Sequence, residues 1–130
     1  MANILVLDDE QDACNLVKRI AEGMKHKAVA FENEDEAIDY AKSNQVDLAI
    51  LDLKLKKISG LDVLEKIKES NPTIKAILLT GYPTVETAKK AVGMGIHSYL
   101  TKPIDVDDLE KGITAALQKG RKGSKEELNI

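Results

Sequence analysis

Residues 4 to 10 read Ile4-Leu5-Val6-Leu7-Asp8-Asp9-Glu10, so that four apolar side chains run directly into three carboxylates. A short, continuous apolar run that ends this abruptly is typical of a strand buried on both faces of a parallel sheet. Burying a strand does not require like charges at its end. The stretch therefore predicts a buried strand and raises the question of what neutralises the carboxylates that follow it.

The composition indicates one ordinary globular domain. The chain has 130 residues, 43% of them hydrophobic and 32% charged, with a formal net charge of −3. A chain of this length can bury roughly two-thirds of its unfolded surface, and its acidic balance argues against a general nucleic-acid binder. The single Cys14 excludes an internal disulfide, and its spacing from His26 and His97 gives no zinc motif. With no apolar run long enough to span a membrane and no leader pattern, we expect a cytoplasmic protein without membrane contact.

The apolar pattern changes period repeatedly along the chain. Short apolar runs predict five strands, at residues 4–7, 27–31, 48–51, 76–79 and 98–100. Apolar residues at helical spacing follow each run and predict five helices. The first helix covers Gln11 to about Met24, with Leu16, Val17, Ile20 and Ala21 on its apolar face. The second follows a capping box at Asn33 to Glu36, and the third carries Leu61, Leu64 and Ile67. The fourth follows the cap Thr84 and carries Val85, Ala88, Ala91 and Val92, and the fifth follows the cap Asp105 and carries Leu109, Ile113, Ala116 and Leu117.

Strands that alternate with helices predict parallel strands with crossover helices on both faces. We therefore expect a doubly wound α/β sandwich. Residues 1–118 contain this pattern, whereas residues 119–130 have no apolar period and are expected to form a polar tail or linker.

The carboxyl ends of parallel strands meet at one edge of the sheet, where ligands bind. The strand ends bring five polar side chains to that edge: Asp8 and Asp9, Asp52, Thr80 and Lys102. Three carboxylates in one place repel one another unless a cation joins them, and oxygen ligands suit a hard divalent ion such as Mg²⁺. Open metal positions suit phosphate oxygens, which a hydroxyl and an ammonium group could also hold. Asp52, alone at the end of its strand, is then the best candidate for a nucleophile that attacks a phosphoryl group.

These elements resemble the receiver domains of two-component response regulators, from about Ile4 to Leu117. The resemblance is carried by five spaced elements: Asp8-Asp9, Asp52, Gly60 eight residues later, Thr80-Gly81, and Tyr99-Leu100-Thr101-Lys102-Pro103. It implies the flavodoxin-like, three-layer fold of chemotaxis regulators, with five helices around a sheet of order 2-1-3-4-5. It also implies that Asp8, Asp9, Asp52 and the backbone carbonyl of Lys54 hold Mg²⁺ while Asp52 accepts a phosphoryl group. Thr80 and Lys102 would contact the phosphoryl oxygens, Thr80 and Tyr99 would form the switch, and the Lys102-Pro103 peptide would be cis.

The resemblance further implies partners and a mode of action. A sensor histidine kinase or phosphotransfer protein would donate the phosphoryl group, and the surface of the last two helices and the last strand would control an effector or output domain, with a phosphorylation-dependent homodimer as one form. The domain would be a phosphoacceptor switch that catalyses only its own phosphorylation and slow dephosphorylation. Two positions depart from the common family pattern: Leu55-Lys56 stands where Met-Pro is usual, and Ser59 stands where an Asp often precedes the glycine. We therefore expect this loop to differ from the common pattern in shape and in charge, since Lys54, Lys56 and Lys57 make it basic.

Three alternatives fit parts of the pattern. A flavodoxin-like electron carrier shares the sheet, but Asp8-Asp9-Glu10 would repel its phosphate, and only 3% of the residues are aromatic. An Asp-nucleophile phosphatase of the haloacid dehalogenase type would carry its two aspartates two positions apart on the first strand, whereas Asp8 and Asp9 are adjacent. A receiver that is never phosphorylated and acts as a protein-binding domain remains the third alternative.

Overall fold

The computed structural model describes residues 1–118, in which five strands alternate with five helices. The predicted tail at 119–130 lies outside the described residues. The strands are β1 (Asn3–Leu7), β2 (Lys27–Phe31), β3 (Leu48–Asp52), β4 (Lys75–Thr80) and β5 (Ser98–Thr101). The helices are α1 (Gln11–Gly23), α2 (Glu34–Ser43), α3 (Gly60–Ser70), α4 (Val85–Gly93) and α5 (Val106–Gln118).

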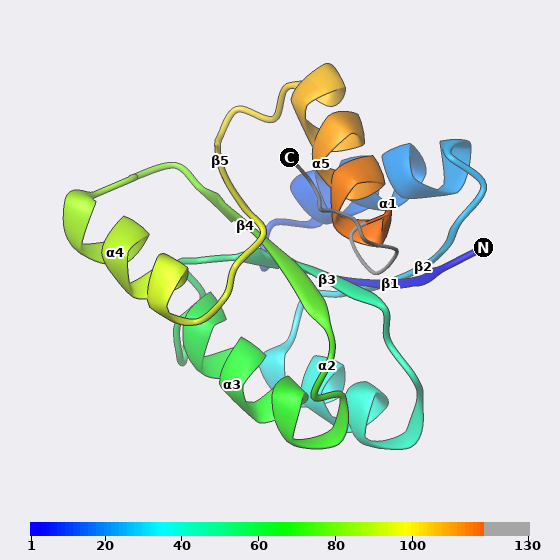
Figure 1. Ribbon diagram of the computed structural model, residues 1–130, viewed down its shortest axis with the longest axis horizontal. Helices are drawn as coiled ribbons and strands as arrows, with labels where there is room; N and C mark the ends of the chain where they lie inside the picture. The colour runs from blue at the N-terminus through cyan, green and yellow to red at the C-terminus, as the bar shows by residue number, and fades with distance from the viewer. Residues whose placement is uncertain (119–130) are drawn as a thin grey trace, which may run out of the picture.

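The strands form one parallel sheet in the order β2-β1-β3-β4-β5. Helices α1 and α5 cover one face, α2 and α3 cover the other, and α4 lies at the side of β4 and β5 (Figure 1). The predicted doubly wound, three-layer sandwich is confirmed, including its strand order. Strand order reverses beside β1 and β3, which places the ends of these two strands at the expected ligand-binding point.

Two hydrophobic clusters, one on each side of the sheet, form the core. Leu5, Leu7 and Leu51 point toward α2 and α3, whereas their neighbours Ile4 and Ile50 point toward α1 and α5. All five residues of β3 are buried, because this central strand is covered on both faces. The continuous apolar runs seen in the sequence are therefore the signature of two-sided burial.

Side-chain caps form at the predicted starts of α2, α4 and α5, whereas α1 begins without one, and the capping box predicted at Asn33 to Glu36 has only its Asn33 half. The Asn33 side chain accepts from the Glu36 amide at 3.1 Å, Thr84 accepts from the Thr87 amide at 3.1 Å, and Asp105 accepts from the Asp108 amide at 2.9 Å. Reciprocal capping boxes occur at Ser59 with Asp62 and at Thr84 with Thr87. Ser59, which departs from the family pattern, thus has a clear role as the cap of α3.

Helix α4 contacts the rest of the domain through a narrow stripe. Ala91 is its one buried residue, whereas Val85 and Val92 are 74% and 78% exposed. In α1, Leu16 is also exposed at 38% and lines a hollow with Pro103 and Ile104. Helical spacing placed these side chains correctly on helices, but it did not distinguish a core face from an open surface.

No helix in the described part of the chain is long and apolar enough to cross a membrane.

Candidate functional site

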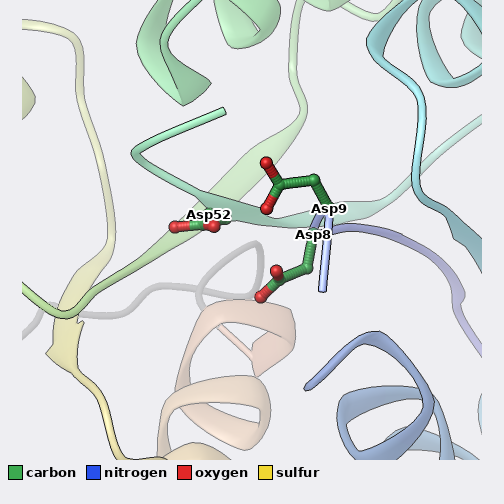
Figure 2. A group of neighbouring side chains, drawn as sticks. All are labelled: Asp8, Asp9 and Asp52. Atoms are coloured by element: carbon green, nitrogen blue, oxygen red, sulfur yellow. The ribbon is translucent and has the colours of Figure 1, made fainter. Parts of the chain in front are cut away.

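Three aspartates gather where β1 and β3 end. Asp8 and Asp52 are almost fully buried, at 1% and 5% exposure, and Asp9 is half-buried beside them. One carboxylate oxygen from each of the three lies within 4.8 Å of the others, and all three point into the same space (Figure 2). Three carboxylate oxygens this close together offer the hard ligands that a divalent cation such as Mg²⁺ prefers.

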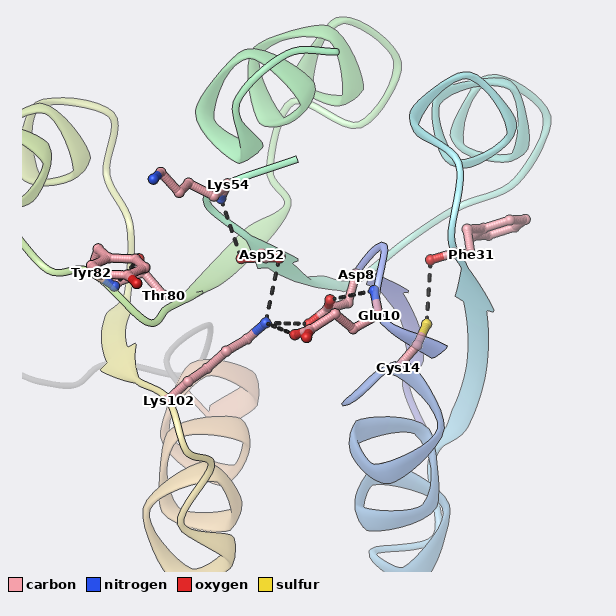
Figure 3. Close-up of polar contacts among 9 residues, drawn as sticks. All are labelled: Asp8, Glu10, Cys14, Phe31, Asp52, Lys54, Thr80, Tyr82 and Lys102. Atoms are coloured by element: carbon pink, nitrogen blue, oxygen red, sulfur yellow. Dashed lines mark hydrogen bonds and ion pairs between the residues drawn. The ribbon is translucent and has the colours of Figure 1, made fainter. Parts of the chain in front are cut away.

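Lys102, which follows β5, reaches into the acidic group. Its Nζ atom lies 2.8 Å from Asp8 Oδ2, 3.3 Å from Glu10 Oε1 and 3.4 Å from Asp52 Oδ2 (Figure 3). The peptide that joins Lys102 to Pro103 is cis. One ammonium group thus faces carboxylates from two strands and from the start of α1.

The charge balance at the site is incomplete. Burial and the neighbouring charge of Asp8 raise the pKa of Asp52 from 3.8 to about 6, although Lys102 acts in the opposite direction. Burial disfavours the Lys102 ammonium, but its close contact with Asp8 and the charges of Asp8 and Asp52 outweigh this and raise its pKa. Asp8 Oδ2 has no hydrogen-bond partner of good geometry among the described residues, despite its proximity to Lys102 Nζ. A buried oxygen left in this state fits a site that gains a cation.

The loop after Asp52 folds back on the strand it leaves. The Lys54 amide donates to Asp52 Oδ1 at 3.2 Å, and the Gly60 amide donates to the Leu53 carbonyl at 2.9 Å. A Cβ atom on Gly60 would collide with the Asp52 carbonyl oxygen. The position therefore requires glycine, which gives a physical reason for the spacing between Asp52 and Gly60.

Thr80 lies at the same edge but is not bonded to the acidic group. It is 1% exposed at the end of β4, and its hydroxyl accepts from the Tyr82 amide at 3.1 Å. Tyr99 is half-buried, with its ring packed against the cluster on the α2 and α3 side and its hydroxyl 2.7 Å from Thr87 Oγ1. The structure therefore brings Asp8, Asp9, Asp52 and Lys102 close together. The hydroxyls of Thr80 and Tyr99 contact Tyr82 and Thr87 instead.

Sequence reasoning missed two contributors. Glu10, quoted at the outset without a role, bonds to Lys102, and adjacency to Asp8-Asp9 was the available signal. The Lys54 ammonium lies 4.8 Å from the centre of the Tyr82 ring, at the rim of the site. The sequence carries no signal for that pair, because 28 positions separate the two residues, from 54 to 82.

A parallel α/β sheet that gathers an acidic group, a lysine and a threonine at its carboxyl edge offers ligands for a cation and an anion side by side. The chain matches the family model described as a response regulator receiver domain over residues 4–114, and it belongs to that family.

Relatives and solved structures agree with this membership. The chain is 30% identical over 115 residues to the transcriptional regulatory protein ZraR of Klebsiella oxytoca, and the match covers 88% of this chain and 26% of ZraR. The chain therefore spans about a quarter of that relative's length. A CheY-like receiver domain from Methanospirillum hungatei superimposes with a TM-score of 0.86 at 27% identity, covering 92% of this chain and 95% of the other. A response regulator from Burkholderia pseudomallei, solved with a phosphorylated aspartic acid, a calcium ion and citrate, gives a TM-score of 0.79 at 32% identity and covers 92% and 68%.

Proposed function

We propose that Asp52 accepts a phosphoryl group from a sensor histidine kinase or phosphotransfer protein, with Mg²⁺ held by Asp8, Asp9, Asp52 and the Lys54 carbonyl. The observation that carries the proposal is the buried Asp52 carboxylate, which lies beside Asp8 and Asp9 and 3.4 Å from Lys102 Nζ at the carboxyl edge of the sheet. The phosphorylated aspartic acid and the calcium ion named for the Burkholderia pseudomallei regulator support the same chemistry here.

In the proposed step, an Asp52 oxygen attacks phosphorus, an acyl phosphate bond forms, and the bond between phosphorus and the donor's histidine nitrogen breaks. The leaving imidazole keeps the electron pair of that bond and takes a proton from water. When bound, Mg²⁺ would neutralise charge on the transferred oxygens. Lys102 Nζ, 3.4 Å from Asp52 Oδ2, is placed to exchange this carboxylate for a phosphoryl oxygen.

The role is that of a switch rather than an enzyme with an external substrate. Asp52 is consumed in each transfer, so the domain catalyses its own phosphorylation and the slow hydrolysis that resets it. Family membership supports a phosphorylation-activated function and disfavours the electron-carrier and phosphatase alternatives. The alternative of a receiver that binds proteins without being phosphorylated is distinguished from this proposal by whether Asp52 takes up a phosphoryl group.

The output is proposed to act through α4, β5 and α5. Thr80 would move its hydroxyl from the Tyr82 amide to a phosphoryl oxygen, and Tyr99 would move further inward as a result. A downstream effector or output domain would read this face, or a second copy would form a homodimer with it. We place the domain in the cytoplasm, without direct nucleic-acid contact of its own. Residues 1–118 would form the receiver and 119–130 a tail or linker.

Incubation with a small phosphodonor and Mg²⁺, read by intact mass, tests the proposal. The wild type should gain one phosphoryl mass, and Asp52→Asn, which keeps the shape but removes the nucleophile, should gain none. Equal labelling of both proteins would remove Asp52 from its role, and peptide mapping would then locate the true acceptor. No labelling of the wild type would favour the unphosphorylated protein-binding domain.

A further inference from the structure

A second buried carboxyl group lies outside the acidic site. Glu34, the first residue of α2, is 4% exposed, although glutamate is rarely buried without a partner. Its Oε2 atom accepts a hydrogen bond of 2.8 Å from the backbone amide of Lys57. Nothing in the phosphoryl chemistry above uses this residue, so its burial requires another explanation.

The Lys57 amide belongs to the loop that joins β3 to α3. The two ends of this loop are fixed by backbone bonds, from the Leu53 amide to the Leu79 carbonyl at 2.8 Å and from the Gly60 amide to the Leu53 carbonyl at 2.9 Å. Between these ends the loop carries Lys54, and it lacks the proline that would stiffen it. The bond to Glu34 connects the middle of the loop to the first turn of α2, the helix that lies beside α3 on the same face of the sheet.

The Glu34 side chain is charged and held in place, both of which favour this hydrogen bond. Burial opposes its charged form, but the backbone N–H groups of Lys57, of Glu34 itself and of Ile58, together with the Lys57 ammonium, outweigh burial and lower the pKa of Glu34. The neighbouring cap from Asn33 fixes the first turn of α2, where a carboxylate is also favoured by the helix dipole. A charged acceptor on a fixed helix end forms a strong hydrogen bond to a neutral donor.

We propose that Glu34 is a positioning residue that fixes the β3–α3 loop and thereby sets the affinity of the acidic site for Mg²⁺. The inference rests on the proposed function, in which the Lys54 carbonyl is one of the metal ligands. Lys54 lies three positions before Lys57, so the clamp acts on the backbone that presents this carbonyl. A loop that is already ordered does not have to lose conformational freedom when the metal binds.

The same lysine provides a matched control. The Lys57 ammonium lies 3.1 Å from Asp35 Oδ2, and both side chains are mostly exposed, at 62% and 71%. Asp35→Asn removes this surface ion pair and leaves the bond from Glu34 to the Lys57 amide in place. Exposed pairs of this kind contribute little, so Asp35→Asn should bind Mg²⁺ as the wild type does.

The experiment compares wild type, Glu34→Ala, Glu34→Gln and Asp35→Asn. Calorimetric titration with Mg²⁺ gives the dissociation constant, amide hydrogen exchange of the metal-free proteins follows residues 54–58, and intact mass gives the phosphorylation rate. Glu34→Ala should speed exchange at Lys57 and weaken Mg²⁺ binding by about tenfold, the lower end for groups that support metal ligands. Its phosphorylation rate should return to near wild type at saturating Mg²⁺. Glu34→Gln, whose amide oxygen still accepts from Lys57, should lie between the two.

Each outcome decides the proposal. Equal Mg²⁺ affinity in wild type and Glu34→Ala, with exchange at Lys57 accelerated, would overturn the clamp and leave the proposed function intact. A wild type that binds no Mg²⁺ would overturn the metal site itself. A rate that stays low at saturating Mg²⁺ would also contradict a positioning role. If Glu34→Ala does not fold, Glu34→Gln carries the same comparison against Asp35→Asn.

Discussion

The acceptor edge, formed by Asp8, Asp52 and Thr80, is buried, whereas helix α4 is mostly exposed. Asp8, Asp52 and Thr80 are at most 5% exposed, at the ends of β1, β3 and β4. Helix α4, in contrast, buries one residue, and its Val85 and Val92 face outward. A rigid site can hold a phosphoryl group in one geometry, whereas a loosely attached helix can change position for a small free-energy difference. The contrast is what a switch requires, since the rigid part receives the signal and the loose part reports it.

Truncating one apolar residue in the sheet and one in α4 should change the free energy of unfolding by very different amounts. Leu78→Ala removes a fully buried side chain from β4 and should lower the free energy of unfolding by about 2–5 kcal/mol, because a cavity remains. Val92→Ala, on the exposed side of α4, should change it by less than about 0.5 kcal/mol. Urea denaturation measures both. A similar cost for the two variants would show that α4 is packed as tightly as the sheet.

The pH dependence of stability tests whether burial and repulsion from Asp8 disfavour the charged form of Asp52. The pKa of Asp52 rises from 3.8 to about 6 on folding, so the folded state binds more protons across this window and stability falls as pH increases through it. In metal-free solution at about pH 8, Asp52→Asn should be more stable than wild type by at most about 3 kcal/mol. The gain should shrink as pH falls through about 6 and vanish below about 3, where the wild-type carboxyl is protonated in both states. Denaturation curves across this range would contradict the assignment if the gain did not depend on pH.

Mg²⁺ should relieve the repulsion that Asp52→Asn removes. At a hundredfold excess over its dissociation constant, Mg²⁺ should stabilise the wild type by about 2.7 kcal/mol. Asp9→Asn should raise the metal-free melting temperature and flatten the response to Mg²⁺, because one of the three crowded carboxylates is gone. Thermal melts with and without Mg²⁺ measure both effects. A wild-type response in Asp9→Asn would exclude Asp9 as a ligand.

One hydroxyl on β5 contributes to the attachment of α4. Tyr99→Phe removes the hydroxyl that lies 2.7 Å from Thr87 Oγ1, and should cost about 0.5–1.5 kcal/mol, typical for one hydrogen bond. It should also increase amide exchange in α4 without phosphorylation. Tyr82→Phe, at a ring that is 73% exposed, is the matched control and should change neither quantity. Unchanged α4 exchange in Tyr99→Phe would show that this bond does not attach the helix.

Most of the fold could be predicted from the sequence, because its strongest signals are local. Continuous apolar runs such as Ile4 to Leu7 mark strands buried on both faces, and polar residues such as Asn33 and Thr84 mark helix starts. The convergence of Asp8 and Asp52 followed from the rule that parallel strands end at one edge. These inferences need no knowledge of side-chain packing.

The remaining features depend on contacts between distant parts of the chain. The clamp between Glu34 and Lys57 joins residues 23 positions apart through a side chain and a backbone amide, and no periodicity encodes it. The exposure of Val85 and Val92 depends on how far α4 stands from the sheet, since their helical spacing is the same as that of buried residues. The raised pKa of Asp52 depends on its burial beside Asp8, which sequence spacing alone does not measure.

We expect a phosphoryl group at Asp52 to change the exposed face of α4 and β5 through Thr80 and Tyr99. Amide hydrogen exchange over residues 84 to 117, with and without beryllofluoride bound at Asp52 as a phosphoryl mimic, measures this coupling. The wild type should show changed exchange in α4 and β5 when the mimic binds. Thr80→Ala, which lacks the hydroxyl now held by the Tyr82 amide, should bind the mimic but lose that change. If Thr80→Ala with the mimic confirmed as bound shows the wild-type change, Thr80 is only a phosphate ligand and the proposed coupling to Tyr99 is wrong.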